Sequence, residues 1–208
     1  NLIGVNSLGV ILATGASVGA VLAKQTHFGL KQFQTYEFIG IIVFMGMVRE
    51  LGPVLSAIMV AGRAGSAMTA EIGTMQITEQ VDALRTLGIN VKQYLIVPRI
   101  LATTLMLPLL SLFCSLCGVI ASYIVSVWFL KVNHQLYLSS IRQNVVMGDI
   151  FHGLIKAVVF GFLIAIIATF KGFNTRGGAK DVGRSTTQSV VMSSLTVLIT
   201  DFILTNML

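Results

Sequence analysis

The chain has 208 residues, of which 55% are hydrophobic and 11% charged, and its mean hydropathy is +0.87. Average soluble domains carry about 25% charged residues, so this composition excludes an ordinary soluble domain and indicates an integral membrane protein. The net charge of +6 does not indicate nucleic-acid binding, because most Lys and Arg residues lie between apolar runs, where they report membrane topology. The sequence begins at Asn1, inside an apolar run and without Met, and we expect a natural N-terminal segment to be missing.

Five apolar runs approach or exceed the roughly 20 residues that a transmembrane helix needs. They cover residues 2–23, 38–62, 97–130, 150–170 and 185–208. A helix satisfies its own backbone hydrogen bonds in lipid, so the sequence predicts an all-α membrane protein. Gly15 and Gly19 in the first run form a GxxxG pair, a spacing that allows close contact with another helix.

The second run contains the adjacent charged residues Arg49 and Glu50, followed by Gly52-Pro53. Neighbouring helix positions point about 100° apart, so these two side chains need not pair with each other. Charges at membrane depth usually face a cavity or a partner, which makes both residues candidates for a functional site. A structural ion pair with other helices is the alternative. Pro53 removes a backbone donor and favours a kink.

The stretch between the second and third runs is polar. Residues 67–87 have apolar side chains near helical spacing, with acidic residues between them, which predicts an amphipathic helix at the membrane surface. Basic amphipathic helices usually seek lipid headgroups. This helix is acidic in its middle, which favours a protein partner.

The third run, residues 97–130, could form one tilted span bent near Pro108 or two short spans. With one span, the connections 63–99 and 171–184 share a side that carries eight Lys/Arg residues, and 24–37 and 131–149 share the other side with four. Two spans would place the basic connections on opposite sides. The positive-inside rule therefore favours five spans, with a cytoplasmic N-terminus and the basic connections in the cytoplasm.

Two further regions complete the membrane part. Residues 131–149 predict a short helix or loop on the outer side, with Trp128 and Tyr137 as interfacial anchors. Lys156 lies about two turns into the fourth run; it could snorkel to the outer headgroups or line a polar cavity. Asp201 lies near the outer end of the fifth run.

Several motifs do not support catalysis. Cys114 and Cys117 form a CxxC inside an apolar run, where packing is the preferred interpretation. Residues 178–185, GAKDVGRS, approach a phosphate-binding loop, but Arg184 replaces the lysine and no strand precedes it. His27 has no second ligand at metal-binding spacing. We expect neither an enzyme nor a metal site.

Residues 49–84, RELGPVLSAIMVAGRAGSAMTAEIGTMQITEQVDAL, resemble the signature of the MlaE/YrbE permease family. Residues 172–191, GFNTRGGAKDVGRSTTQSVV, resemble that family's second signature. The similarity extends over essentially the whole chain, and the family's N-terminal surface helix is absent. The resemblance implies a single permease domain over residues 1–208, with five transmembrane helices, a cytoplasmic coupling helix at about 67–87 and a short outer-side helix or loop.

The resemblance also implies partners. The chain would form a homodimer, bind a cytoplasmic ABC ATPase and meet an MCE-domain protein, usually a hexameric ring, on the other side. It would move phospholipid in a bacterial inner membrane, or in the plastid inner envelope. It would carry no cofactor, because ATP and magnesium would be bound by the ATPase.

By the same resemblance, three groups of residues have expected roles. Arg49, Glu50 and Lys156 would line the substrate cavity. The residues that would contact the ATPase are Glu71, Thr78, Glu79, Gln80 and Asp82. The residues that mark the second cytoplasmic loop are Gly177, Gly178, Gly183 and Arg184.

Two other classes stay open. An ion-coupled secondary transporter would use Arg49, Glu50, Lys156 and Asp201 as a relay, although no internal repeat of the kind such folds show is visible. A membrane scaffold without transport is the other class. An ATPase requirement for lipid movement would discriminate among all three.

Overall fold

The structure, a computed structural model, describes residues 5–31 and 35–207, and all regular elements in these ranges are helical. The α-helices are α1 (Val5–Lys31), α2 (Ile39–Met45), α3 (Gly52–Val60), α4 (Ser66–Ile77), α5 (Gln80–Thr86), α6 (Val97–Ile124), α7 (His134–Asn144), α8 (Met147–Phe173) and α9 (Ala179–Met207). A 3₁₀ turn, η1 (Tyr36–Phe38), precedes α2, and four π-helical turns interrupt the long helices: η2 (Gly46–Leu51), η3 (Ala61–Gly65), η4 (Lys92–Ile96) and η5 (Val125–Phe129).

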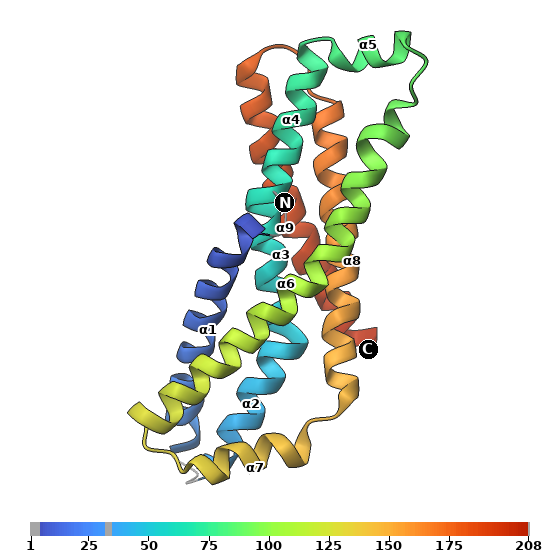
Figure 1. Cartoon of the computed structure of the whole chain (residues 1–208). Helices are drawn as coiled ribbons and strands as arrows, with labels where there is room; N and C mark the ends of the chain where they lie inside the picture. The colour runs from blue at the N-terminus through green and yellow to red at the C-terminus, as the bar shows by residue number, and fades with distance from the viewer. Residues whose placement is uncertain (1–4, 32–34, 208) are drawn as a thin grey trace.

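These elements join into five helices that are long and apolar enough to cross a membrane (Figure 1). They cover Ser7–Lys31, Ile39–Ile77, Lys92–Phe129, Met147–Phe173 and Ala179–Met207. The five-helix prediction is therefore confirmed for the described residues. The third span is one helix that continues through Pro108. The first helix extends eight residues beyond its predicted end at 23, so residues 24–31 are helical.

The predicted helix at 67–87 is the main difference from expectation. The second span continues for 39 residues to Ile77, about 58 Å of helix, which is longer than the roughly 30 Å hydrocarbon core. Its last part, α4, buries Met68 and Ile72 against α8 and α9. Glu79 then has a positive φ of 58°, and α5 follows as a separate short helix. The stretch predicted as one helix is thus divided: its first part is the end of the second span, and its last part is the short helix α5.

The GxxxG pair of α1 packs directly against α6. A Cβ added at Gly15 would overlap the carbonyl of Cys114, and one added at Gly19 would overlap the backbone of Gly118. Helices that approach this closely gain van der Waals contact along their whole crossing. The expected helix contact is therefore confirmed. Cys114 is a fully buried free thiol, which confirms its packing role.

The two ends of the bundle differ in character. Figure 1 shows α5 and the α8–α9 connection at one end and α7 at the other, so the two basic connections share an end as the charge count requires.

Of the two predicted interfacial anchors, Trp128 is 76% exposed, but Tyr137 is 1% exposed and its hydroxyl is hydrogen-bonded to the Ser122 hydroxyl at 2.8 Å. Tyr137 is therefore not an interfacial anchor, because α7 folds back under α2. Burial raises the pKa of the Tyr137 hydroxyl above its ordinary value, more than the Ser122 hydrogen bond lowers it.

Candidate functional site

The charged pair of the second span lies on a π-helical turn, η2. Pro53 has no N–H to bond the carbonyl four residues before it, and the Gly52 N–H donates to Met47, five residues before it. The Met47 carbonyl also accepts a hydrogen bond from the Ser115 hydroxyl of α6 at 3.1 Å. Such single π-turns often occur at functional sites. Arg49 and Glu50 both lie on this turn.

Glu50 belongs to an ion cluster that joins three spans. The amine of Lys156, on α8, donates to Glu50, to Asp201 at 3.2 Å and to the Thr205 hydroxyl at 2.7 Å. The Lys156 side chain is 2% exposed, so it does not snorkel toward headgroups. Asp201 and Thr205 lie one turn apart on α9. The cluster therefore ties η2, α8 and α9 together within an apolar bundle.

Arg49 turns away from this cluster to a different partner. One of its guanidinium nitrogens lies 3.6 Å from a carboxylate oxygen of Asp149, which caps the start of α8 by accepting from the Val146 N–H at 3.1 Å. The Arg49 side chain is 35% exposed. The 3.6 Å separation is longer than a hydrogen bond, so the guanidinium keeps donors for a further anion. Arg49 and Glu50 have different partners, in agreement with the expectation that they need not pair with each other.

The charged groups of the ion cluster and of the Arg49–Asp149 pair differ in how far solvent or a ligand can reach them. Lys156 is enclosed, whereas the Glu50 and Asp201 side chains are 36% and 21% exposed. With every group ionised, the cluster and the Arg49–Asp149 pair together hold two cations and three carboxylates. Such a set can bind a polar headgroup or a cation at the bundle surface. Among the described residues, no group of three His, Cys, Asp or Glu side chains could hold a metal ion.

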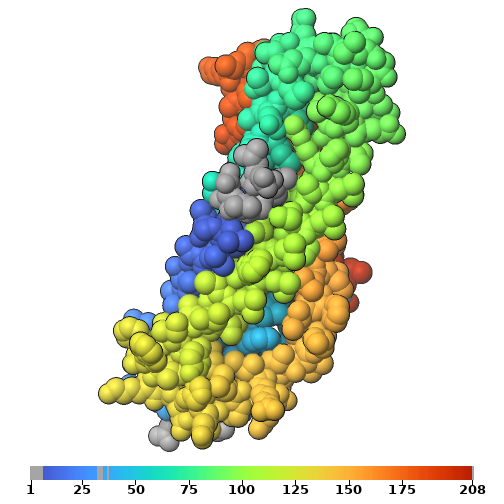
Figure 2. Space-filling view, in the orientation of Figure 1, coloured from blue at the N-terminus to red at the C-terminus, as the bar shows by residue number. Residues whose placement is uncertain are grey.

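A small apolar hollow lies beside this site. It has a volume of about 120 Å³ and lies between α2, α6 and α8. Its lining includes Val48 of η2 and Gly153 of α8, and a Cβ at Gly153 would overlap the Val48 carbonyl. Figure 2 shows the hollow on this face, between α6 and α8 with α2 at its floor. The π-turn is therefore tightly packed on one side and open on another.

The predicted ATPase-contact residues lie at one end of the bundle and all are exposed: Glu71, Thr78, Glu79, Gln80 and Asp82. Three of them have side-chain partners within the chain, and the Thr78 hydroxyl donates to the Thr74 carbonyl at 2.8 Å. Glu71 pairs with Arg99 of α6 at 2.9 Å, and Asp82 pairs with Arg85 at 2.8 Å. Glu79 and Gln80 form the junction between α4 and α5, where they project into solvent.

The loop predicted at residues 171–184 is shorter than expected. Gly177 has a φ of +109°, and a Cβ there would overlap the Asp181 carboxylate, which accepts from the Gly178 N–H at 3.1 Å. These contacts require glycine at 177 and begin α9 at Ala179. Gly183 and Arg184 are therefore helical residues of α9 and not loop residues. The sequence GAKDVGRS at 178–185 is thus mostly helical and does not form a phosphate-binding loop.

Sequence reasoning assigned no role in the site to Thr205 or Asp149. Asp201 and Thr205 are one turn apart in an apolar run, a spacing that could have indicated a polar face. Asp149 had the position of a helix cap. Outside the site, Thr69 gave no signal in the sequence: its hydroxyl contacts the Ala168 carbonyl of α8 at 3.0 Å and the Ser189 hydroxyl of α9 at 2.9 Å.

Comparison with known proteins is consistent with this architecture. The family model described as Permease MlaE matches residues 1–207. The chain is 43% identical over 206 residues to a probable ABC transporter permease protein of Rickettsia typhi, covering 99% of this chain and 80% of the relative. It is 37% identical to the intermembrane phospholipid transport system permease protein MlaE of Haemophilus influenzae, covering 99% of this chain and 79% of the relative.

A plant relative also matches. The chain is 40% identical over 203 residues to the chloroplastic protein TRIGALACTOSYLDIACYLGLYCEROL 1 of Arabidopsis thaliana, covering 98% of this chain and 58% of the relative. The family match over nearly the full chain, the two bacterial permeases and the five apolar helices agree with one another. The chain belongs to the MlaE permease family and is a multi-pass permease subunit of an ABC transporter.

Proposed function

We propose that this permease moves phospholipids between the bacterial inner membrane and an MCE-domain partner, driven by a separate cytoplasmic ATPase. The observation that carries the proposal is the ion cluster of Lys156, Glu50 and Asp201 inside an apolar bundle. Charges at this depth are costly and usually serve a transport pathway. The name of the Haemophilus influenzae relative, an intermembrane phospholipid transport system permease, supports this substrate class.

The partial exposure of the carboxylates supports a cavity between two copies of the chain. Glu50 is 36% exposed and Asp201 21% exposed, and a carboxylate facing acyl chains would be strongly disfavoured. On α9, exposed apolar side chains surround Asp201, among them Leu198 and Phe202. A second subunit packed on this helix would cover the apolar residues and leave the cluster facing a shared polar space. This reasoning supports a homodimer as part of the proposal.

Within such a cavity, Arg49 is the residue suited to a lipid phosphate. Its guanidinium can hold a phosphate with two parallel hydrogen bonds, and its 3.6 Å contact with Asp149 leaves donors available. Lys156 is enclosed by three partners, so its role is to orient Glu50 and Asp201 rather than to bind lipid directly. Acyl chains need only an apolar wall.

The ATPase would dock on the end of the molecule formed by the last turn of α4 and by α5. Glu79 and Gln80 are exposed at the junction, and acidic side chains facing a basic groove would steer and register the contact. ATP and magnesium would be bound by that partner. Because α4 continues the second span without a break in helix, movement at the docking site would reach η2 directly.

The test is reconstitution of the full-length subunit. It is purified in mild detergent from its own host, and mass spectrometry identifies the proteins and lipids that accompany it. The complex is then placed in liposomes with fluorescent phospholipid and an acceptor MCE protein. We expect lipid transfer that requires ATP and is abolished by Lys156→Met. Transfer driven by a proton gradient without ATP would replace this proposal with the ion-coupled transporter.

A further inference from the structure

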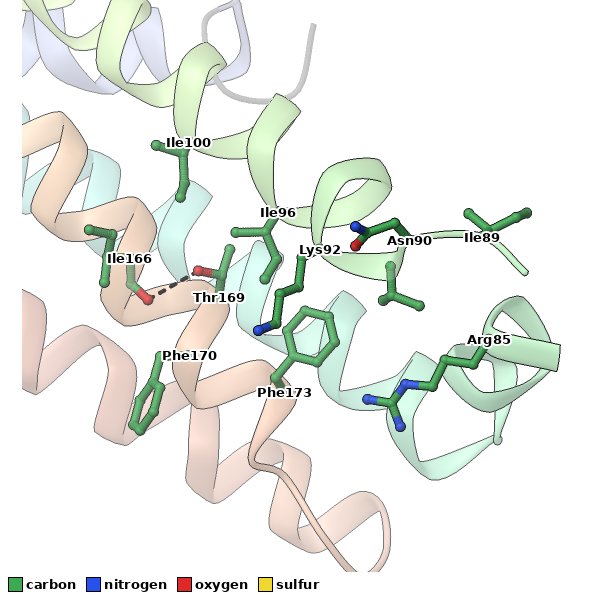
Figure 3. Close-up of a pocket in the computed structure, with 11 residues that line it drawn as sticks. Arg85, Ile89, Asn90, Lys92, Ile96, Ile100, Ile166, Thr169, Phe170 and Phe173 are labelled. Carbon is green, nitrogen blue, oxygen red and sulfur yellow. Dashed lines mark hydrogen bonds between the residues drawn. The ribbon is translucent and has the colours of Figure 1, made fainter. Parts of the chain in front are cut away.

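A large cavity lies away from the ion cluster, at the end of the bundle that carries α5. It has a volume of about 730 Å³, within the range of about 300–1,000 Å³ for small-molecule sites. Its lining comes from α5 and the connection after it, from the start of the third span and from the last turns of α8 (Figure 3). We propose that this cavity binds one anionic phospholipid of the cytoplasmic leaflet, separately from the transport pathway.

The lining has the two chemical parts that such a lipid requires. Most of the lining residues are apolar: Ile89, Val91, Ile96, Ile100, Ile166, Phe170 and Phe173. Two cations, Arg85 and Lys92, lie on the same cavity. Figure 3 shows both cationic ends directed toward the side where Phe173 lies. An apolar body with a cationic rim fits a phosphate attached to acyl chains.

The two cations differ in availability. Arg85 is already paired with Asp82 at 2.8 Å, so its charge is partly satisfied. Lys92 has no carboxylate partner in the part of the chain that the structure describes. The Thr169 hydroxyl is buried and donates to carbonyls of its own helix, so it offers no further donor. Lys92 is therefore the principal phosphate ligand, and Arg85 is the secondary one.

The position of the cavity matches the headgroup level of a membrane. Lys92 begins the third apolar span and Phe173 ends the fourth. Phe170, which lines the cavity, is 62% exposed, and Leu101, which follows the lining residue Ile100 on the third span, is 56% exposed. The cavity therefore opens sideways, where acyl chains would lie. Basic pockets between spans on the cytoplasmic side are known to suit anionic headgroups.

A lipid at this place would connect parts that otherwise touch little. α5 is held by a small apolar cluster, in which its Val81 packs with Val91, Leu95 and Phe173. Val91 and Phe173 also line the cavity. A bound lipid would thus bridge Arg85 of α5 to the third and fourth spans. Its effect on coupling rests on the proposed ATPase docking, whereas the binding itself does not.

The test counts bound lipid on the complete subunit by native mass spectrometry in mild detergent. The subunit is titrated with dioleoyl phosphatidylglycerol, and with dioleoyl phosphatidylcholine as the neutral lipid. We expect one phosphatidylglycerol per subunit whose affinity falls about fivefold in Lys92→Gln, the effect of one interfacial cation. Lys180→Gln, which removes an exposed lysine at the same end outside the cavity, should retain it.

A second variant tests the cavity without changing charge. Ile100→Trp fills the apolar part, and we expect it to lose the same phosphatidylglycerol while leaving lipid at the ion cluster unaffected. Equal affinity in Lys92→Gln and the natural protein would overturn the proposal. So would an equal loss in Lys180→Gln, full retention in Ile100→Trp, or equal binding of phosphatidylcholine.

A final arm separates a lipid from a soluble anion. Inorganic phosphate and glycerol 3-phosphate at millimolar concentration should not displace the bound phosphatidylglycerol, because they lack acyl chains. Displacement by either would identify the site as one for free phosphate groups. If the natural protein shows no ATP-driven lipid transfer but binds phosphatidylglycerol at this cavity, only the proposed function is contradicted. If it transfers lipid with ATP but does not bind phosphatidylglycerol at this cavity, only the present inference is contradicted.

Discussion

Lys156 of α8 and Glu50 of η2, 106 positions apart in the chain, form a hydrogen-bonded ion pair inside the apolar bundle. Asp201 and Thr205 of α9 complete the coordination of the same amine. The pair therefore joins the second, fourth and fifth spans at one point. Because water has little access to Lys156, the arrangement is sensitive to the loss of any partner.

Replacing Lys156 by Met should leave Glu50 and Asp201 without a cation. Removing one member of a buried pair typically costs about 3–5 kcal/mol, so we expect Lys156→Met to lower the unfolding temperature in detergent clearly. Glu50→Gln should cost less, because Asp201 and Thr205 still satisfy the amine. Circular dichroism during heating measures both. A larger loss in Glu50→Gln than in Lys156→Met would contradict the central position of the lysine.

Gly19→Ala should separate α1 from α6. The added Cβ would overlap the backbone of Gly118, which cannot rotate away, and overpacking of this kind costs about 1–3 kcal/mol. Gly9→Ala is the matched control, since the same helix has open space around Gly9 and alanine favours helix by about 1 kcal/mol. We expect the first variant to unfold at lower temperature and the second to be unchanged or more stable. Equal behaviour would refute the close crossing.

Glu79→Lys should abolish association with the ATPase while the subunit stays in the membrane. The change reverses a charge at an exposed position and adds no new backbone strain, because glutamate already has a φ of 58° there. Glu79→Gly provides the control: it relieves the left-handed conformation and removes the charge without reversing it. Co-purification of tagged subunit and ATPase gives the readout. Normal recovery of the ATPase with Glu79→Lys would argue against docking at the α4–α5 junction.

The variant Tyr137→Phe should lose less stability than the natural protein when the pH is raised into the alkaline range. The pKa of Tyr137 is raised by burial, so the folded protein favours the neutral phenol. Stability from this residue is complete below the unfolded pKa of about 10 and is lost as pH rises through the folded pKa. At pH 8, Tyr137→Phe should be less stable by about 1 kcal/mol, because the hydrogen bond to Ser122 is absent. The difference in melting temperature between the natural protein and Tyr137→Phe should therefore be smaller at pH 11 than at pH 8. An equal difference at the two pH values would contradict the raised pKa of Tyr137.

The sequence alone determined the class of the protein and the number of its spans. Hydropathy and charge act locally along the chain, so the apolar runs, the basic connections at one end and the choice of one span at 97–130 could be read from residue order. The GxxxG pair of Gly15 and Gly19 likewise indicated a helix contact. The identity of the facing residues, Cys114 and Gly118, could not be read in this way.

The tertiary structure decided which charges meet. Arg49 and Glu50 are adjacent in sequence, yet one pairs with Asp149 and the other with Lys156. The structure also placed Arg99 against Glu71 and divided residues 67–87 at Glu79. These outcomes depend on contacts between distant segments, where burial makes an unpaired charge costly, and no local pattern specifies the partner that removes that cost.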